Sequence, residues 1–237
     1  MNFLESINII ELITSILAWI VIGLLTNYLY TKQEVKPTFW KILLILFIGF
    51  FTFSINWQLF NTYIKIPILP LGVWIVYAVF KNKNEKWKSY RPFAWLGFFA
   101  NFIFLIALLL AIPFNHFIYP ESELETYISN IEKATLVTIH PSAKDSSLDK
   151  EMLKKQTPFL SEELIQSHEW YIDTEMNKHS KKVVERFPYQ LIGFSTKWGS
   201  SLKTVVYLEK DGKGILISTK NKQLYFRSEY SLIKGGN

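Results

Sequence analysis

Two long uncharged runs flank a short, strongly charged stretch in the first half of the chain. The runs cover 66–80 and 92–118, and between them KNKNEKWKSYR, residues 81–91, carries six charges. A chain that leaves runs of this length uncharged must bury them in a protein core or in a lipid bilayer. This pattern therefore restricts the first half to a membrane fold or a large apolar helical core.

Four apolar segments are long enough to cross a bilayer, whose hydrocarbon core of about 30 Å needs roughly 20 residues of helix. They are predicted as transmembrane helices at 9–30, 39–57, 62–80 and 93–118. The third is the weakest, because Lys65, Pro67 and Pro70 crowd its first half. A soluble bundle is disfavoured, since so short a region could not bury four helices that are apolar all round.

The composition changes near Tyr119. Residues 1–118 carry nine basic and four acidic residues, whereas 119–237 carry 17 basic and 16 acidic residues. The first half therefore has long uncharged runs and a net charge of +5, and the second is charged throughout with a net charge of +1. We expect two domains, a transmembrane helical domain over 1–118 and a soluble domain over 119–237.

Basic residues predict the orientation in the membrane. The stretch between the third and fourth apolar segments contains Lys81, Lys83, Lys86, Lys88 and Arg91, and the loop between the first two contains Lys32 and Lys36. Short loops rich in Lys and Arg stay in the cytoplasm, so four crossings place both basic loops inside and both the N-terminus and the C-terminal domain outside. Binding of acidic lipid headgroups or of a cytoplasmic partner by the basic stretch is an alternative reading.

The N-terminal apolar segment lacks the basic start and the small-residue cleavage site of a secretory signal peptide. We expect it to remain as an anchor in a multi-pass protein of the cell membrane. The richness in Lys, Ile and Asn is typical of a protein from a low-GC Gram-positive bacterium.

The second half is predicted to be an extracytoplasmic α+β domain. Helical pieces are expected at 122–133, 151–155, 161–166 and 171–186, and strands at 135–140, 190–196, 202–209, 214–219 and 223–228. Asp211 and Gly212 predict a tight hairpin turn in which Gly212 adopts a positive φ angle. These elements together predict an antiparallel β-meander with helices packed on one face.

The sequence contains no catalytic or metal-binding motif. The absence of cysteine excludes disulfides and thiolate chemistry. His168 and His179 in HEWYIDTEMNKH are separated by about 16 Å along a helix, too far to share an ion. No Gly-x-Ser-x-Gly elbow or phosphate-binding glycine loop occurs. We therefore expect no catalytic residue, cofactor or metal, and the nearly neutral second half argues against nucleic-acid binding.

Polar groups in the apolar half form the other candidate site, because such groups are costly in a bilayer and are usually partnered. On the predicted topology Glu11, Asn56, Lys65 and His116 all lie near the outer interface. We hypothesise that Glu11 pairs with Lys65 or His116 in a polar patch beneath the outer domain. Helix packing or ordinary interfacial positions explain the same residues without a function.

The pattern favours an integral membrane interaction protein. Its partners are the lipid bilayer and a protein, peptide or envelope component that the outer domain binds in sensing, assembly or immunity. An extracytoplasmic enzyme with an unrecognised site is the alternative, and it requires a cleft that holds His168 and a carboxylate with a perturbed pKa. A small transporter or channel requires a continuous polar path, and the lack of an evident inverted repeat disfavours it.

Overall fold

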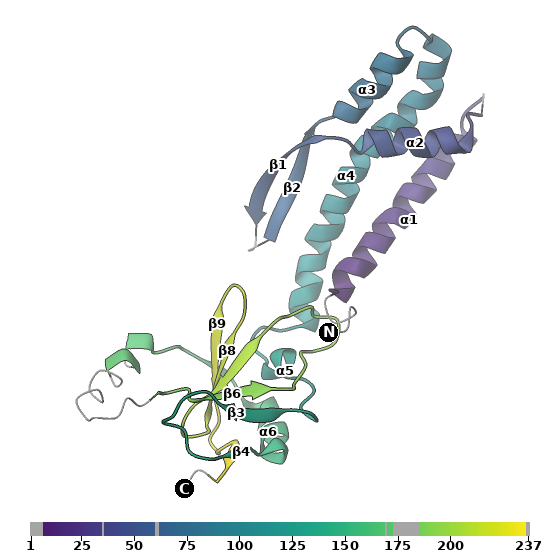
Figure 1. Cartoon of the computed structure of the whole chain (residues 1–237). Coiled ribbons are helices and arrows are strands. Elements are labelled where there is room, and N and C mark those ends of the chain that lie inside the picture. The colour runs from purple at the N-terminus through teal and green to yellow at the C-terminus, as the bar shows by residue number, and fades with distance from the viewer. Residues whose placement is uncertain (1–6, 35, 60–61, 169, 173–184, 236–237) are drawn as a thin grey trace. The chain divides into compact units, whose positions relative to one another are not determined.

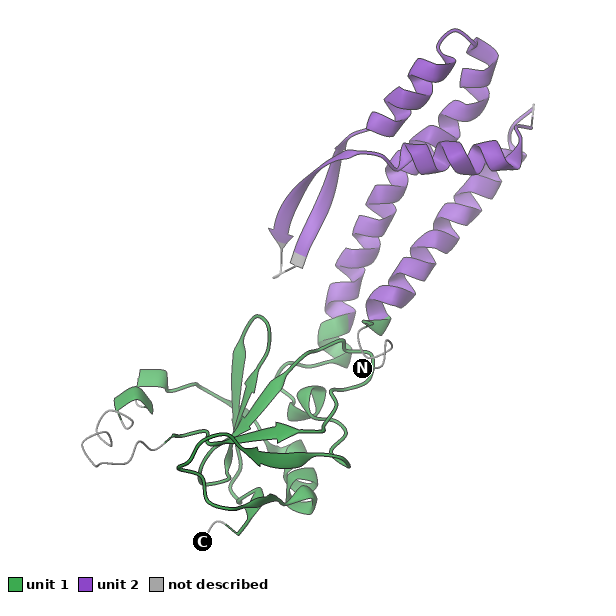
Figure 2. Cartoon of the chain, viewed as in Figure 1, with its two compact units in different colours: residues 1–9, 115–237 green, residues 10–114 purple. Residues whose placement is uncertain are grey.

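The protein divides into two compact units in the computed structural model (Figure 2). The helical unit comprises residues 10–114, and the sheet unit comprises residues 1–9 and 115–237. The structure describes residues 7–34, 36–59, 62–168, 170–172 and 185–235.

The helical unit consists of helices and one β-hairpin (Figure 1). Its elements are α1 (Ile9–Thr31), α2 (Phe39–Gly49), β1 (Phe53–Leu59), β2 (Thr62–Leu69), α3 (Leu71–Phe80) and α4 (Asn84–Ile118). The first residue of α1 and the last turn of α4 belong to the sheet unit. α1 and α4 run in opposite directions, and α2 crosses between them. Ile22 of α1, Leu46 of α2 and Ala100 of α4 share one buried cluster, so these three helices pack together.

Two of the described helices are long and apolar enough to cross a membrane, α1 with 23 residues and α4 with 35. The predicted helices at 9–30 and 93–118 lie within them. Only 17% of the most apolar part of α1 and 33% of that of α4 are buried, whereas the core helix of a soluble protein is mostly buried. The two helices therefore fit a membrane protein.

The predicted helices at 39–57 and 62–80 are wrong as continuous helices. α2 ends at Gly49, α3 begins at Leu71, and most of the residues between them form the antiparallel hairpin β1–β2. The sequence FTFSINWQL, residues 51–59, alternates strictly between apolar and polar residues, which is the period of a strand. Pro67 and Pro70 also disfavour a helix there, because proline has no backbone N–H to donate.

Three glycines bring α2, α3 and α4 into backbone contact. At each of them an added Cβ would overlap a main-chain carbonyl oxygen, that of Ala94 for Gly49, of Ile48 for Gly72 and of Leu46 for Gly97. No side chain fits at these positions without moving a helix. The close approach lets residues from all three helices, among them Ile45, Val73 and Phe93, form a second buried cluster.

The sheet unit is built around a six-stranded antiparallel sheet in the order β3-β6-β7-β8-β9-β5 (Figure 1). Its elements are α5 (Leu124–Tyr127), β3 (Thr135–Thr138), β4 (Ser147–Leu148), α6 (Lys150–Gln156), the 3₁₀ helix η2 (Thr157–Phe159), β5 (Glu162–Glu163), β6 (Tyr189–Ile192), β7 (Val205–Leu208), β8 (Gly214–Ser218), β9 (Gln223–Arg227) and β10 (Ile233–Lys234). The short strands β4 and β10 pair separately. The predicted antiparallel sheet in the C-terminal part of the chain is confirmed.

The core of the sheet unit lies on one face of this sheet. Leu124 and Tyr127 of α5 and Leu153 of α6 are buried in one cluster with inward residues of β6 to β9, such as Leu191 and Ile215. The Asp149 carboxylate accepts a hydrogen bond from the backbone N–H of Met152 and thereby caps α6. α5 and α6 thus cover one face of the sheet.

Several local predictions in this unit differ from the structure. The helix expected at 122–133 is limited to the four residues of α5, and its N-cap is Glu123, whose side chain makes no capping hydrogen bond. The helix expected at 161–166 is replaced by β5, which pairs with β9. The helix expected at 171–186 lies mostly outside the described residues. The turn at Asp211 and Gly212 is confirmed, since Gly212 has a φ of 73° and joins β7 to β8.

Candidate functional site

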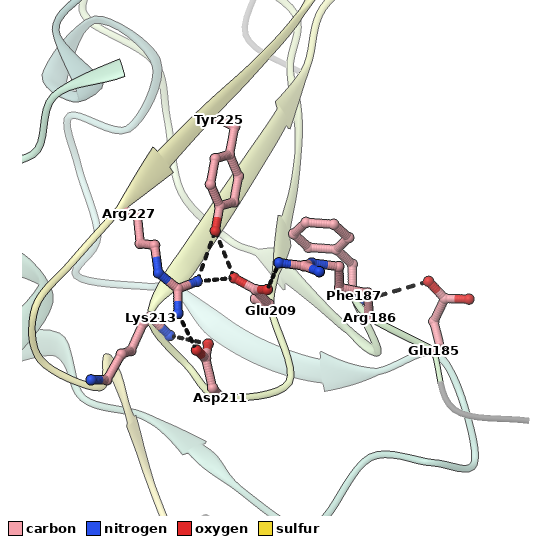
Figure 3. A network of polar contacts seen from close by, with 8 residues as sticks. All are labelled: Glu185, Arg186, Phe187, Glu209, Asp211, Lys213, Tyr225 and Arg227. Atoms are coloured by element: carbon pink, nitrogen blue, oxygen red, sulfur yellow. Dashed lines mark hydrogen bonds and ion pairs between the residues drawn. The ribbon is translucent and has the colours of Figure 1, made fainter. Parts of the chain in front are cut away.

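A buried carboxylate at the end of β7 is the centre of a network of ion pairs and hydrogen bonds (Figure 3). Glu209 is 6% exposed. Its Oε1 lies 2.7 Å from Nη2 of Arg186, and its Oε2 lies 2.5 Å from Nη1 of Arg227. The hydroxyl of Tyr225 donates to the same Oε2 at 2.7 Å. Both carboxylate oxygens are therefore held by cationic donors.

The network continues into the turn between β7 and β8. Nη2 of Arg227 lies 2.6 Å from Oδ2 of Asp211, and Oδ1 of Asp211 accepts the backbone N–H of Lys213 at 2.8 Å. Gly214 leaves room for these groups, because a Cβ there would overlap the carboxylate of Glu209 and lie 2.7 Å from the hydroxyl of Tyr225. In the sequence Gly212-Lys213-Gly214, the first two residues belong to the turn and Gly214 leaves space for the ion pairs.

An aromatic cluster covers the same network. The ring of Trp170 lies 4.7 Å from the guanidinium carbon of Arg186 and packs edge-on against the rings of Phe187 and Tyr225. Burial and, next, the hydrogen bond to Glu209 raise the pKa of Tyr225 to about 12. At neutral pH the phenol is a donor. Both oxygens of Glu209 accept from arginine donors, an arrangement typical of a structural ion-pair network.

The sheet face opposite the core is only partly covered. The strand register places Val137, Gln190, Tyr207 and Leu216 in one row on that face, ending at Tyr225 under Trp170. Val137 is 39% exposed, and a neighbouring row contains Ile192 and Val205, which are 43% and 39% exposed. This open face combines half-exposed apolar side chains with polar groups, so it offers both apolar contact and hydrogen bonding to a bound segment.

The edge strand β3 carries backbone groups that point away from the sheet. The N–H of Ile139 donates to the carbonyl of Pro188 on the β6 side, so the alternate residues Leu136 and Thr138 direct their N–H and C=O groups outward. Among the described residues these outward groups have no hydrogen-bond partner. Residues 134–139, ATLVTI, contain none of the Lys or Pro residues that normally protect an edge.

The structure places the four residues of the predicted polar patch on four different elements. Asn56 of β1 and Lys65 of β2 lie directly opposite each other on the hairpin. Glu11 lies in the first turn of α1, and His116 lies in the last turn of α4, within the sheet unit. The pairing of Glu11 with Lys65 or His116 stays a prediction.

The predicted basic stretch is mostly helical. The residues from 84 onward, including Lys86, Lys88 and Arg91, belong to the first turns of α4, and only Lys81 and Lys83 lie in the connection after α3. Nζ of Lys88 lies 3.3 Å from Oε1 of Glu85, an exposed pair one turn away. The charges therefore form an extension of α4 beyond its apolar part.

The histidines of the sheet unit do not converge in the part of the chain that the structure describes. Nδ1 of His140 lies 2.8 Å from Oγ of Ser142, and that hydroxyl also accepts the backbone N–H of Glu185. His168 is helical, and His179 lies outside the described residues. No group of three or more His, Asp or Glu residues in the described ranges is close enough to hold a metal ion.

Comparisons of the chain with protein-family models, with curated proteins and with solved structures found no match. The functional assignment therefore rests on the geometry of the two units.

Proposed function

We propose that the protein is an integral membrane interaction protein whose sheet unit binds an extended segment of a protein or peptide on the extracytoplasmic side. The observation that carries the recognition step is the outer edge of β3, with the outward backbone groups of Leu136 and Thr138. A partner strand satisfies such groups by adding to the sheet, and its alternate side chains then reach the adjoining open face.

The exposed surface of the helical unit supports the membrane anchor. Large apolar side chains along α1 and α2 are open, including Leu24 at 65%, Trp40 at 77% and Phe47 at 77%. Exposed apolar patches of this kind are unfavourable in water, at about 25 cal/mol per Å², and are covered by hydrocarbon in a bilayer.

The chain directions support the predicted orientation with two crossings as well as with four. The C-terminus of α1 and the N-terminus of α4 lie at the same end of the helical unit, and the basic residues Lys32, Lys36 and 81–91 lie there too (Figure 1). α2 and α3 are both too short to cross the bilayer as single helices. Whether both segments cross or neither does, α4 begins on the side of the membrane where α1 ends. The positive-inside rule then assigns this end to the cytoplasm.

An extended peptide suits the β3 edge better than a second copy does. β3 has four residues, and a β3–β3 contact between two copies would bury far less than the roughly 1,000 Å² that a stable dimer needs. A peptide of six or seven residues gains its hydrogen bonds from the edge and its specificity from Val137 and the residues beside it.

A proline substitution at the edge tests this proposal. Thr138→Pro removes an outward N–H that β6 does not use, so the sheet should persist while strand addition fails. Full-length protein in detergent is used to select random seven-residue peptides displayed on phage. Enriched peptides should alternate between apolar and polar residues. They should bind the control Thr138→Val as tightly as the wild type and bind Thr138→Pro at least tenfold more weakly than the wild type.

Two results would contradict strand addition at β3. One is equal binding of the enriched peptides to wild type and Thr138→Pro. The other is that no peptide is enriched although near-UV circular dichroism shows that the sheet unit of the selected protein is folded.

A further inference from the structure

A cavity between α1 and α2 lies in the helical unit near its basic end. Its volume is about 410 Å³, within the usual range of small-molecule sites. One face of α1 lines it with Trp19, Ile22, Gly23, Thr26, Asn27 and Tyr30, and α2 contributes Phe39, Ile42, Leu43 and Leu46. No charged side chain lines the cavity, so its interior suits a hydrocarbon chain.

Gly23 is what keeps this cavity open. Nothing lies within 4 Å of the position that a Cβ would take on this residue. At the other glycines of the helical unit, such as Gly49 and Gly97, neighbouring backbone atoms occupy the space that a Cβ would take. The open space at Gly23 therefore belongs to the groove and is available to a ligand.

The rim of the cavity is basic. Nζ of Lys36 lies 5.8 Å from the ring centre of Tyr30, which lines the cavity. Lys41 precedes the lining residue Ile42 on α2, whereas Lys32 lies 4.6 Å from the ring centre of Tyr28, which does not line the cavity. With Glu34, the segment 32–41 carries three positive charges and one negative charge. An apolar groove that opens beside clustered lysines complements an acyl chain with an anionic headgroup.

We propose that this groove binds one acyl chain of an anionic phospholipid, with its headgroup phosphate at Lys36. The proposal rests on the membrane location proposed above. Tyr30 holds Lys36 beside the cavity through a cation–π contact, and the lining residue Asn27 supplies an amide that can donate hydrogen bonds. The site lies in the leaflet that meets the basic end of the unit.

The test uses the full-length protein reconstituted with equal amounts of phosphatidylglycerol and phosphatidylcholine, extracted in mild detergent and weighed by native mass spectrometry. Wild type should retain one phosphatidylglycerol in preference to phosphatidylcholine. Gly23→Leu should lose this lipid without unfolding, because a leucine fits the open groove. Ser15→Leu, on an exposed part of α1 outside the groove, should retain it.

A second pair of variants tests the headgroup contact. Lys36→Gln should reduce the preference for phosphatidylglycerol about fivefold, which corresponds to the roughly 1 kcal/mol that one basic residue contributes near an anionic lipid. Lys86→Gln removes a charge from α4, which does not line the cavity, and should leave the preference unchanged.

Each remaining outcome would overturn a specific step. Equal retention of both lipids, or a lipid that Gly23→Leu still retains, refutes the anionic site. A dimer that Gly23→Leu dissociates identifies a second copy of the chain as the occupant and also refutes it. Failure of the wild type to float with the vesicles would instead refute the membrane location, so the two proposals fail in different measurements.

Discussion

At the scale of single residues, Glu209 is the one charged residue that is buried among the described residues. Its side chain is 8% exposed, while Arg186 and Arg227 are 29% and 35% exposed. Removing water from a carboxylate is costly, and here two guanidinium groups and a phenol offset that cost. The network joins the end of β7, β9 and Arg186, three residues before β6, so it holds the β7–β8 turn in place.

Glu209→Gln should destabilise the protein by about 2–3 kcal/mol. A neutral amide leaves two half-buried arginines without their shared charge, although their partial exposure keeps the loss below that of a fully buried pair. Asp211→Asn is the matched control, because Asp211 is 42% exposed and its ion pair should contribute about 0–1 kcal/mol. Thermal unfolding followed by near-UV circular dichroism measures both. Equal losses would show that Glu209 does not organise the network.

Tyr225 should make the protein sensitive to alkali. Its pKa in the folded protein is about 12, whereas a tyrosine in an unfolded chain titrates near 10. The folded state thus holds the phenol proton more tightly, and the stabilisation is complete below about pH 10 and is lost as the pH rises toward 12. Unfolding of wild type and Tyr225→Phe in denaturant is compared from pH 8 to 11.5. The stability of wild type should fall more steeply, and parallel curves would contradict this linkage.

At the scale of elements, the sequence predicted α1, α4 and the antiparallel meander from their length and period alone. It failed between Phe51 and Leu69, where overall hydrophobicity outweighed a visible alternation of apolar and polar residues. Asn56 was therefore expected on a helix and instead lies opposite Lys65 on a hairpin. A two-residue period, counted before hydropathy, would have identified the hairpin.

The candidate sites were less predictable than the elements. The ion pairs of Glu209 join residues 18 and 23 positions away in the chain, and no local pattern indicates such contacts. The outward edge of β3 depends on which strand ends the sheet, which is set by the pairing of β3 with β6 over more than 50 residues. The groove at Gly23 depends on the crossing of α1 and α2.

The contact among α2, α3 and α4 should be sensitive to side-chain size. Gly97→Leu places carbon atoms where the backbone of α2 lies, so the helices must separate at a cost of about 3 kcal/mol or more. Gly23→Leu makes the same chemical change at an open position and should leave stability within about 0.5 kcal/mol. The temperature at which half of the detergent-solubilised protein aggregates compares them. Similar temperatures for both variants would mean that the glycine contact does not hold the unit together.

At the scale of the whole molecule, we assign anchoring to the helical unit and recognition to the sheet unit. The helical unit has open apolar surface and basic residues at one end. The sheet unit has its own core and an edge strand, β3, whose outward backbone groups have no hydrogen-bond partner among the described residues. On the proposed orientation the β3 edge faces the outside, and the groove at Gly23 faces the cytoplasmic leaflet. Recognition and lipid binding are thus assigned to opposite sides of the bilayer.

The absence of cysteine from the chain allows this orientation to be tested with single substitutions and no background. Lys210→Cys in the sheet unit and Asn82→Cys in the connection between α3 and α4 both change exposed residues. In intact cells a membrane-impermeant maleimide should label Cys at position 210, and it should label position 82 only after the membrane is permeabilised. Two crossings and four crossings predict the same result, because in both cases the chain is back on the side where α1 ends when α4 begins. Labelling of position 82 in intact cells, with position 210 protected, would reverse the protein and move the β3 edge and its partner into the cytoplasm.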